Sequence, residues 1–258
     1  MMMWTDLGKK TDWKKSIMKK RSKWDIGLFV ICLGFYLFFP FYDGPVWCKD
    51  SLSYATMNIT REPLYPSFLW IFRKIFGDPG YLMTVVIVQS VLAAYATWKL
   101  AVTVQAYKED SKVLALLSIG FQFGVTLLNR FIANRGSSYI DSIMTEGLGL
   151  SLYVLFMVQL YRYTMEGKRK NLAGTACFAV LLVNLRKQML ITLCLMAAVF
   201  FLYYLIKKRK VKKLLLLFAM TAGLLLACKF TDKLYNYCVR GVWMEHSGNA
   251  MGMLCTLI

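Results

Sequence analysis

The chain has 258 residues, of which 58% are hydrophobic, and its mean hydropathy is +0.48. These values are far above those of an ordinary soluble domain, so they argue against a water-soluble globular protein and indicate an integral membrane protein. The formal net charge is +18, carried mainly by lysines and arginines in short segments between apolar runs. That distribution argues against a nucleic-acid partner and favours a lipid bilayer as the surroundings of the protein.

Apolar runs of roughly 20 residues, long enough to cross about 30 Å of hydrocarbon, recur along nearly the whole chain. They predict an all-α, polytopic transmembrane bundle of about seven spans, at residues 25–42, 81–100, 113–128, 145–163, 172–185, 189–206 and 214–229. Helices are preferred to a barrel because the runs are continuous and do not alternate. Within 172–206, Asn184, Arg186 and Lys187 interrupt the apolar run, which predicts two short helices joined by a tight outer turn.

Basic residues are retained on the cytoplasmic side of short loops, and residues 1–24 are rich in lysine. The N-terminus is therefore expected in the cytoplasm. The later basic clusters, such as residues 207–213, then fall on the same side. This organisation gives a cytoplasmic N-terminal segment (1–24), a transmembrane domain (25–229) and an extracytoplasmic tail (230–258).

The first outer loop, residues 43–80, is too long for a simple connection. Its residues 64–76 carry apolar side chains at helical spacing, which predicts an amphipathic helix lying in the outer interface. Pro63 and Pro66 suit the first turn of such a helix. Asp50 precedes this helix, and we expect it to face a cavity at the membrane surface.

Charged residues on the outer side are functional candidates, because a carboxylate near a bilayer costs free energy unless it is paired or hydrated. The outer acidic candidates include Asp141 and Glu146, and the outer basic ones are Arg130, Arg135, Arg186 and Lys187. Arginine suits bidentate contact with phosphate oxygens, so a cavity bordered by both charges fits a phosphate-bearing lipid. Structural pairing, of Arg130 with Asp141 or of Arg186 with Glu146, is the alternative.

The sequence gives little reason to expect a metal or cofactor. It has one histidine, no Cys-x-x-Cys pair and no Asp-x-Asp pair in the first outer loop. We expect no zinc site and no cofactor, while a divalent metal remains open.

Four short motifs carry a family resemblance. The loop after the first span carries Asp50-Ser51-x-x-Tyr54 and Arg61-Glu62-Pro63-Leu64-Tyr65-Pro66. The fourth span opens with Met144-Thr145-Glu146-Gly147-Leu148, and the sixth opens with Leu185-Arg186-Lys187-Gln188-Met189-Leu190. Over about residues 25–230 the chain resembles the C-type (GT-C) membrane glycosyltransferases, the group that includes protein mannosyltransferases and the aminoarabinose transferase of lipid A.

The resemblance implies transfer of a sugar from a polyprenyl-phosphate-linked donor to a glycan, lipid or protein acceptor outside a bacterial plasma membrane. It maps the family's acidic residue onto Asp50, with Asp43 as the second choice, in the role of general base. The residues expected to bind substrate are Tyr54, Arg61, Glu62, Tyr65, Arg130, Arg135, Asp141, Glu146, Arg186 and Lys187.

Two further expectations accompany this interpretation. Members of that family are usually several hundred residues longer, which predicts a chain truncated at its C-terminus, whose activity is then uncertain. The alternative function is a non-enzymatic polytopic membrane protein, such as a transporter or flippase subunit or an accessory protein.

Overall fold

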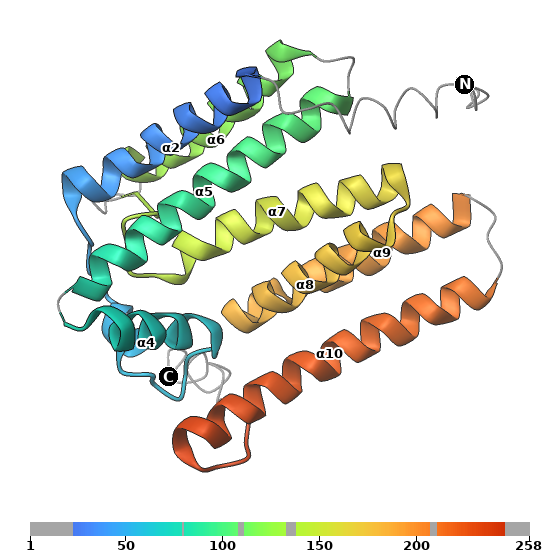
Figure 1. Ribbon diagram of the computed structural model, residues 1–258. Coiled ribbons are helices and arrows are strands. Elements are labelled where there is room, and N and C mark those ends of the chain that lie inside the picture. The colour runs from blue at the N-terminus through green and yellow to red at the C-terminus, as the bar shows by residue number, and fades with distance from the viewer. Residues whose placement is uncertain (1–22, 79, 108–110, 133–137, 207–210, 246–258) are drawn as a thin grey trace.

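The computed structural model describes residues 23–78, 80–107, 111–132, 138–206 and 211–245 (Figure 1). The elements are α2 (Lys23–Asp43), α3 (Ser51–Ala55), α4 (Leu64–Phe76), α5 (Gly80–Tyr107), α6 (Lys112–Ile132), α7 (Thr145–Glu166), α8 (Arg169–Leu185), the 3-10 helix η2 (Lys187–Met189), α9 (Leu190–Ile206) and α10 (Val211–Arg240). No β-strand occurs within these ranges, so the all-α expectation is confirmed. The basic segment 1–22, Arg135 and residues 246–258 lie outside the described part of the chain.

Three helices are long and apolar enough to cross a membrane, namely α2, α5 over Gly80–Ala106, and α6. They correspond to the first three predicted spans. The other four predicted spans also fall on helices, α7 to α10. Helices α8 and α9 have 17 residues each, about 25 Å at 1.5 Å per residue, which is short for a full crossing. A seven-span bundle therefore remains a prediction.

The predicted break in the apolar stretch 172–206 is present. Helix α8 ends at Leu185, η2 covers Lys187–Met189, and α9 begins at Leu190. Arg186 adopts an extended backbone conformation, with φ −152° and ψ 126°. Helix α10 runs to Arg240, well beyond the predicted end of the last span at residue 229.

Helix α4 covers the 64–76 range predicted for an amphipathic helix. Tyr65 and Leu69 are buried against the protein, whereas Trp70 and Ile75 on other sides are 49% and 66% exposed. Gly77 ends the helix with φ +65°, a backbone conformation that glycine adopts without strain. The exposed apolar side chains suit a membrane interface, but the interfacial position itself is untested.

Helix α5 lies at the centre of the packing and contacts α2, α4, α6 and α7 (Figure 1). One hydrophobic core joins α4, α5, α7, α8 and α9, and a second joins α2, α5 and α6. In the second core, Tyr36 of α2 shares a hydrogen bond of 2.9 Å with Thr97 of α5, while Phe35 stacks on Phe123 of α6. Helix α10 packs against α8 and α9, on the side of these helices that faces away from α7.

The outward faces of α2 and α6 are apolar. On α6, Val113, Leu117 and Phe121 are 66%, 63% and 68% exposed, and on α2, Val30 is 60% exposed. A continuous apolar surface of this kind is unfavourable in water and favourable against lipid tails. Length, apolarity and outward exposure together make these helices candidate membrane spans.

Candidate functional site

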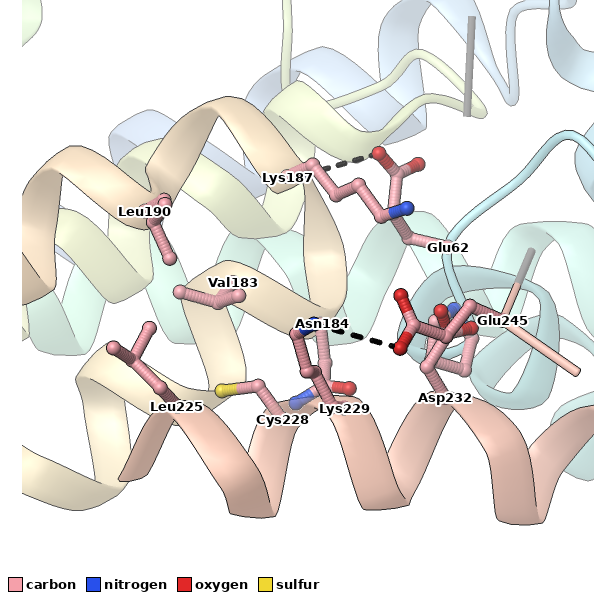
Figure 2. A pocket seen from close by; sticks show the side chains of 11 residues that line it. Glu62, Val183, Asn184, Lys187, Leu190, Leu225, Cys228, Lys229, Asp232 and Glu245 are labelled. Carbon is pink, nitrogen blue, oxygen red and sulfur yellow. Dashed lines mark hydrogen bonds and ion pairs between the residues drawn. The ribbon is translucent and has the colours of Figure 1, made fainter. Parts of the chain in front are cut away.

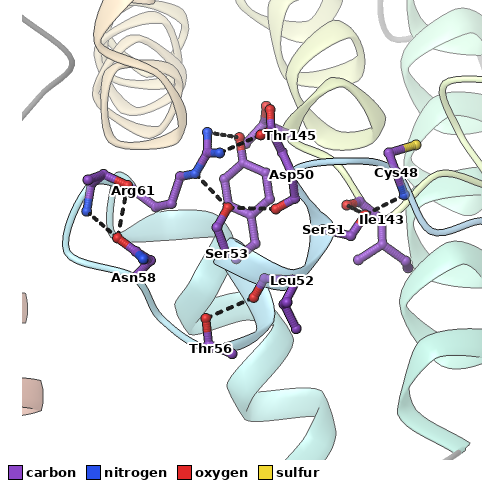
Figure 3. A network of polar contacts seen from close by, with 12 residues as sticks. Cys48, Asp50, Ser51, Leu52, Ser53, Thr56, Asn58, Arg61, Ile143 and Thr145 are labelled. Carbon is purple, nitrogen blue, oxygen red and sulfur yellow. Dashed lines mark hydrogen bonds and ion pairs between the residues drawn. The ribbon is translucent and has the colours of Figure 1, made fainter. Parts of the chain in front are cut away.

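Asp50 lies at the start of the short helix α3, and Arg61 is its partner. The Arg61 Nη2 donates to Asp50 Oδ1 at 2.6 Å, and its Nε donates to the Ser53 hydroxyl at 2.7 Å (Figure 3). The guanidinium also lies 4.6 Å from the centre of the Tyr54 ring. The Asp50 side chain is 41% exposed. Asp50, Ser53 and Arg61 therefore form one compact polar unit with Asp50 open to solvent, whereas the predicted substrate-binding residue Tyr54 is 2% exposed and belongs to the hydrophobic core.

The beginning of α7 contributes a second carboxylate–arginine pair. Arg186, after the end of α8, donates from Nη2 to Glu146 Oε1 at 3.0 Å. Thr145 donates its hydroxyl to the other Glu146 oxygen at 3.3 Å. This is the Arg186–Glu146 pairing that the sequence offered as the structural alternative, and both side chains remain partly exposed.

A third contact connects the first outer loop to the α8–α9 turn. The backbone amide of Lys187 donates to Glu62 Oε1 at 3.0 Å. Glu62 follows Arg61 directly, and Lys187 follows Arg186 directly. Segments that are more than a hundred residues apart in sequence therefore meet at one end of the helices.

Beside these contacts lies a pocket of about 230 Å³, between the Glu62–Pro63 segment, the α8–α9 turn and α10 (Figure 2). Its apolar wall is formed by Val183, Leu190, Leu225 and Cys228. Its polar lining consists of Glu62, Asn184, Lys187, Lys229, Asp232 and Glu245. Figure 2 shows the apolar side chains at one end of the pocket and the carboxylates at the other. The lining is thus amphipathic.

Asp43 and Asp141 form a separate group around Arg130. Arg130 binds both oxygens of Asp43, with Nη2 to Oδ1 at 2.9 Å, and its Nη1 lies 3.9 Å from Asp141 Oδ2. The expected Arg130–Asp141 proximity is present, but Asp43 makes the closer contact. Asp43 is only 14% exposed and Asp141 is fully buried.

The ionisation of Asp141 is strongly perturbed. Burial raises the pKa of its carboxyl to about 7, the Asp43 carboxylate acts in the same direction, and the hydrogen bond from Ser138 opposes them. The Asp141 Oδ2 atom is buried without a hydrogen-bond partner. In this position the neutral, protonated form of the carboxyl group is favoured at mildly acidic pH.

Tyr65, a predicted substrate-binding residue, lies inside the core. Its side chain has no exposed surface, and its hydroxyl donates to Gln89 Oε1 of α5 at 2.9 Å. Burial raises the pKa of this phenol well above its ordinary value. Tyr65 and Asp141 therefore present no surface for direct contact with a substrate in this structure, in contrast to Asp50, Arg61, Glu146 and Arg186.

Several residues at the site were not predicted. Gln89 is a buried amide within an otherwise largely apolar stretch of α5, and polar side chains inside such helices mark functional candidates in membranes. Asp232 and Glu245 of the pocket belong to the outer carboxylates of the predicted topology, but no motif singled them out as site residues, and Lys229 was not predicted either. Among the residues that the structure describes, no group of three or more His, Cys, Asp or Glu side chains could hold a metal ion.

Comparisons of the chain with known protein families, with curated proteins and with solved structures found no match.

Proposed function

We propose that the chain is an integral membrane glycosyltransferase that moves a sugar from a polyprenyl-phosphate-linked donor to an acceptor on the extracytoplasmic face. The observation that carries the proposal is the meeting of Asp50–Arg61, Glu146–Arg186 and Glu62–Lys187 at one end of the helices. Beside them lies a pocket with an apolar wall. Carboxylates, cations and an apolar surface are together what a phosphate-bearing lipid and a hydroxyl nucleophile require.

Asp50 is assigned as the general base. Its exposed carboxylate can accept the proton of an acceptor hydroxyl while that oxygen attacks the anomeric carbon. The bond from the anomeric carbon to the phosphate oxygen breaks, and the polyprenyl phosphate leaves with the bonding electrons, which inverts the configuration. Asp43, the second choice, is held by Arg130 and is largely covered, so Asp50 is the better placed of the two.

Arg186 and Lys187 are assigned to the phosphate of the donor. Arg186 is 31% exposed, and its guanidinium has further N–H donors beyond the one bound to Glu146. Fixed positive groups stabilise the charge that develops on a departing phosphate. The isoprene unit next to the phosphate would contact Val183, Leu190 and Leu225. Glu146 and Glu62 would then orient the sugar or the acceptor hydroxyl.

The membrane orientation of the proposal rests on the charge distribution. Because basic residues are retained on the cytoplasmic side, we propose that the N-terminus lies in the cytoplasm and that the membrane is a bacterial plasma membrane. After one crossing by α2, the loop that carries Asp50 lies outside. The acceptor is a glycan, lipid or protein that is reachable from that side.

The proposal is tested with membranes that contain the full chain. They are given undecaprenyl-phosphate-linked hexoses and pentoses, tritiated in the sugar, and tritium is counted in the polar-lipid, polysaccharide and protein fractions. Asp50→Asn is expected to lower incorporation at least about 100-fold, the scale of losing a general base. The matched control is Asp78→Asn, since Asp78 is an exposed carboxylate that pairs with Arg73 of α4. Full incorporation by Asp50→Asn would sink the mechanism.

A further inference from the structure

Between α6 and α7 the chain passes through a buried, non-helical segment, residues 138–144, whose backbone groups need partners. Four consecutive carbonyls of this segment are bound by groups from elsewhere. Gln89 Nε2 donates to Ile140 O at 2.7 Å and to Ser142 O at 3.2 Å. The Val46 amide donates to Asp141 O at 2.9 Å, and the Ser51 hydroxyl donates to Ile143 O at 2.8 Å (Figure 3).

These bonds join the two chain segments that carry Asp50 and Glu146. Ser51 is adjacent to Asp50, and Ile143 precedes Glu146 by three residues. The Ser51 hydroxyl, which also accepts the Cys48 amide at 2.8 Å, is completely buried. The first outer loop and the beginning of α7 are therefore attached to the same short stretch of backbone.

The Gln89 side chain contacts three parts of this arrangement: α4, the 140–142 backbone and the first turn of α7. It is fully buried on α5, and besides the two carbonyls it accepts the Tyr65 hydroxyl of α4. It also lies against Gly147, the residue after Glu146: a Cβ at position 147 would stand 2.5 Å from the Gln89 amide nitrogen. Only glycine fits there while Gln89 keeps its bonds.

We propose that Gln89 is a positioning residue that fixes the separation of the Asp50 and Glu146 carboxylates, by holding α4, the 140–143 backbone and the first turn of α7 together. This inference rests on the proposed function for its catalytic consequence, but its geometric content does not depend on it. A misplacement of about 1 Å at a reacting centre can cost about 100-fold in rate. Loss of Gln89 should therefore lower kcat strongly and change KM little.

The geometric content is tested by distance measurement. Nitroxide labels are placed on cysteines introduced at Leu52 of α3 and Leu150 of α7, both exposed, in a full chain whose accessible native cysteines are replaced by serine. Pulsed electron paramagnetic resonance then gives the distribution of distances between them. Gln89→Leu, which removes both the donor and the acceptor, is expected to shift or broaden this distribution. Gln122→Leu, which changes a glutamine of α6 outside the network, is expected to leave it unchanged.

The contact with Gly147 provides a second, independent measurement. Gly147→Ala is expected to lower the melting temperature in the wild-type background, because its Cβ meets the Gln89 amide. In a Gln89→Ala background the space is free, so the same substitution should cost much less, and the two effects should be non-additive. Should Gln89→Leu not accumulate, Gln89→Asn, whose amide is one carbon too short to reach the same partners, replaces it.

An unchanged distance distribution in a folded Gln89 variant, or additive effects at 89 and 147, would overturn the positioning role. The proposed glycosyltransferase function is contradicted by a different result, namely full sugar transfer by Asp50→Asn. A changed distance together with that second result would keep the positioning role and discard the enzyme. A lower melting temperature with an unchanged distance would show that Gln89 only stabilises the fold.

Discussion

The Arg186 guanidinium donates to the Glu146 carboxylate at 3.0 Å and so links the end of α8 to the first turn of α7 across forty residues. Both side chains keep part of their surface exposed. The pair is thus strong enough to orient two helix ends and open enough to exchange partners. An arginine in this situation can reach a bound phosphate without first being uncovered.

The first prediction concerns this pair. Glu146→Gln and Arg186→Gln are each expected to lower stability modestly, with a coupling of about 1 kcal/mol between them, as for partly exposed ion pairs. The reversed pair, Glu146→Arg with Arg186→Glu, should recover part of the stability. It should not recover sugar transfer, because the charges are exchanged. Thermal unfolding in detergent and the tritium assay measure the two quantities.

The raised pKa of Asp141 leads us to expect that the stability of the fold depends on pH. The pKa of this carboxyl in the folded protein is raised to about 7 from an ordinary value of 3.8. Because the folded state binds the proton more tightly than the unfolded state, the contribution of this group to stability is full below pH 3.8 and is lost as the pH rises to about 7. Asp141→Asn, an imitation of the protonated form, should therefore melt higher than the wild type at pH 8.

A pH series with a matched variant provides the control for that prediction. The difference in melting temperature between Asp141→Asn and the wild type should grow from pH 5 to pH 8, whereas Asp78→Asn should give a constant difference, since Asp78 is 55% exposed. A difference for Asp141→Asn that is independent of pH would show that the carboxyl is ionised throughout this range.

Arg130 lies against two carboxyl groups and offsets their negative charge. Its removal is therefore expected to lower the stability of the fold strongly. Arg130→Gln leaves Asp43 and Asp141 covered and facing each other without a cation, at a cost of about 3 kcal/mol. Adding Asp43→Asn should restore much of the loss, because only one carboxyl then remains. If the double variant is less stable than Arg130→Gln alone, the two aspartates do not repel each other. Chemical denaturation in mild detergent gives these free energies.

The pocket can be tested by filling it. Cys228 is buried in the apolar wall, so Cys228→Trp adds an indole to a space of about 230 Å³. We expect the KM for the lipid-linked donor to rise about tenfold, equivalent to about 1.4 kcal/mol of lost binding. Cys194→Trp on the exposed side of α9 is the matched control. Equal donor KM values in the two variants would place the donor elsewhere.

The orientation can be measured with a membrane-impermeant maleimide on intact cells, in a background without accessible native cysteines. Leu52→Cys in the first outer loop should be labelled, and Lys170→Cys at the start of α8 should be labelled only after permeabilisation. The opposite pattern would invert the topology and move the Asp50 site into the cytoplasm.

Local sequence signals located the long helices and the break at Arg186, because apolar runs and interrupting charges act over a few residues, but they missed the short α3 and the extension of α10 to Arg240. The range of α4 was predicted to the residue from its spacing and its prolines. The same pattern could not say which residues of α4 would be buried, so Tyr65 was expected at the site and lies in the core instead. Burial of an amphipathic helix depends on what it packs against, and that partner, α5, comes from elsewhere in the chain.

Pairings between distant residues were only partly predictable. Arg186 with Glu146 and Arg130 with Asp141 were anticipated from their shared side of the membrane, but Asp43 was not recognised as the closer partner of Arg130. The role of Gln89 also depends on four segments that meet only in the folded chain. No local pattern encodes such a meeting point.

The pocket has an unusual outer wall, because α10 packs against α8 and α9 and turns Leu226, which is 67% exposed, away from them. In the proposed seven-span arrangement, a ligand with a long hydrocarbon tail would not need to leave the bilayer to enter such a space. It could approach sideways, in the plane of the membrane, and pass only its head group between the helix ends. The tail length of such a ligand would then have little influence on its binding, since most of it would remain in the surrounding lipid.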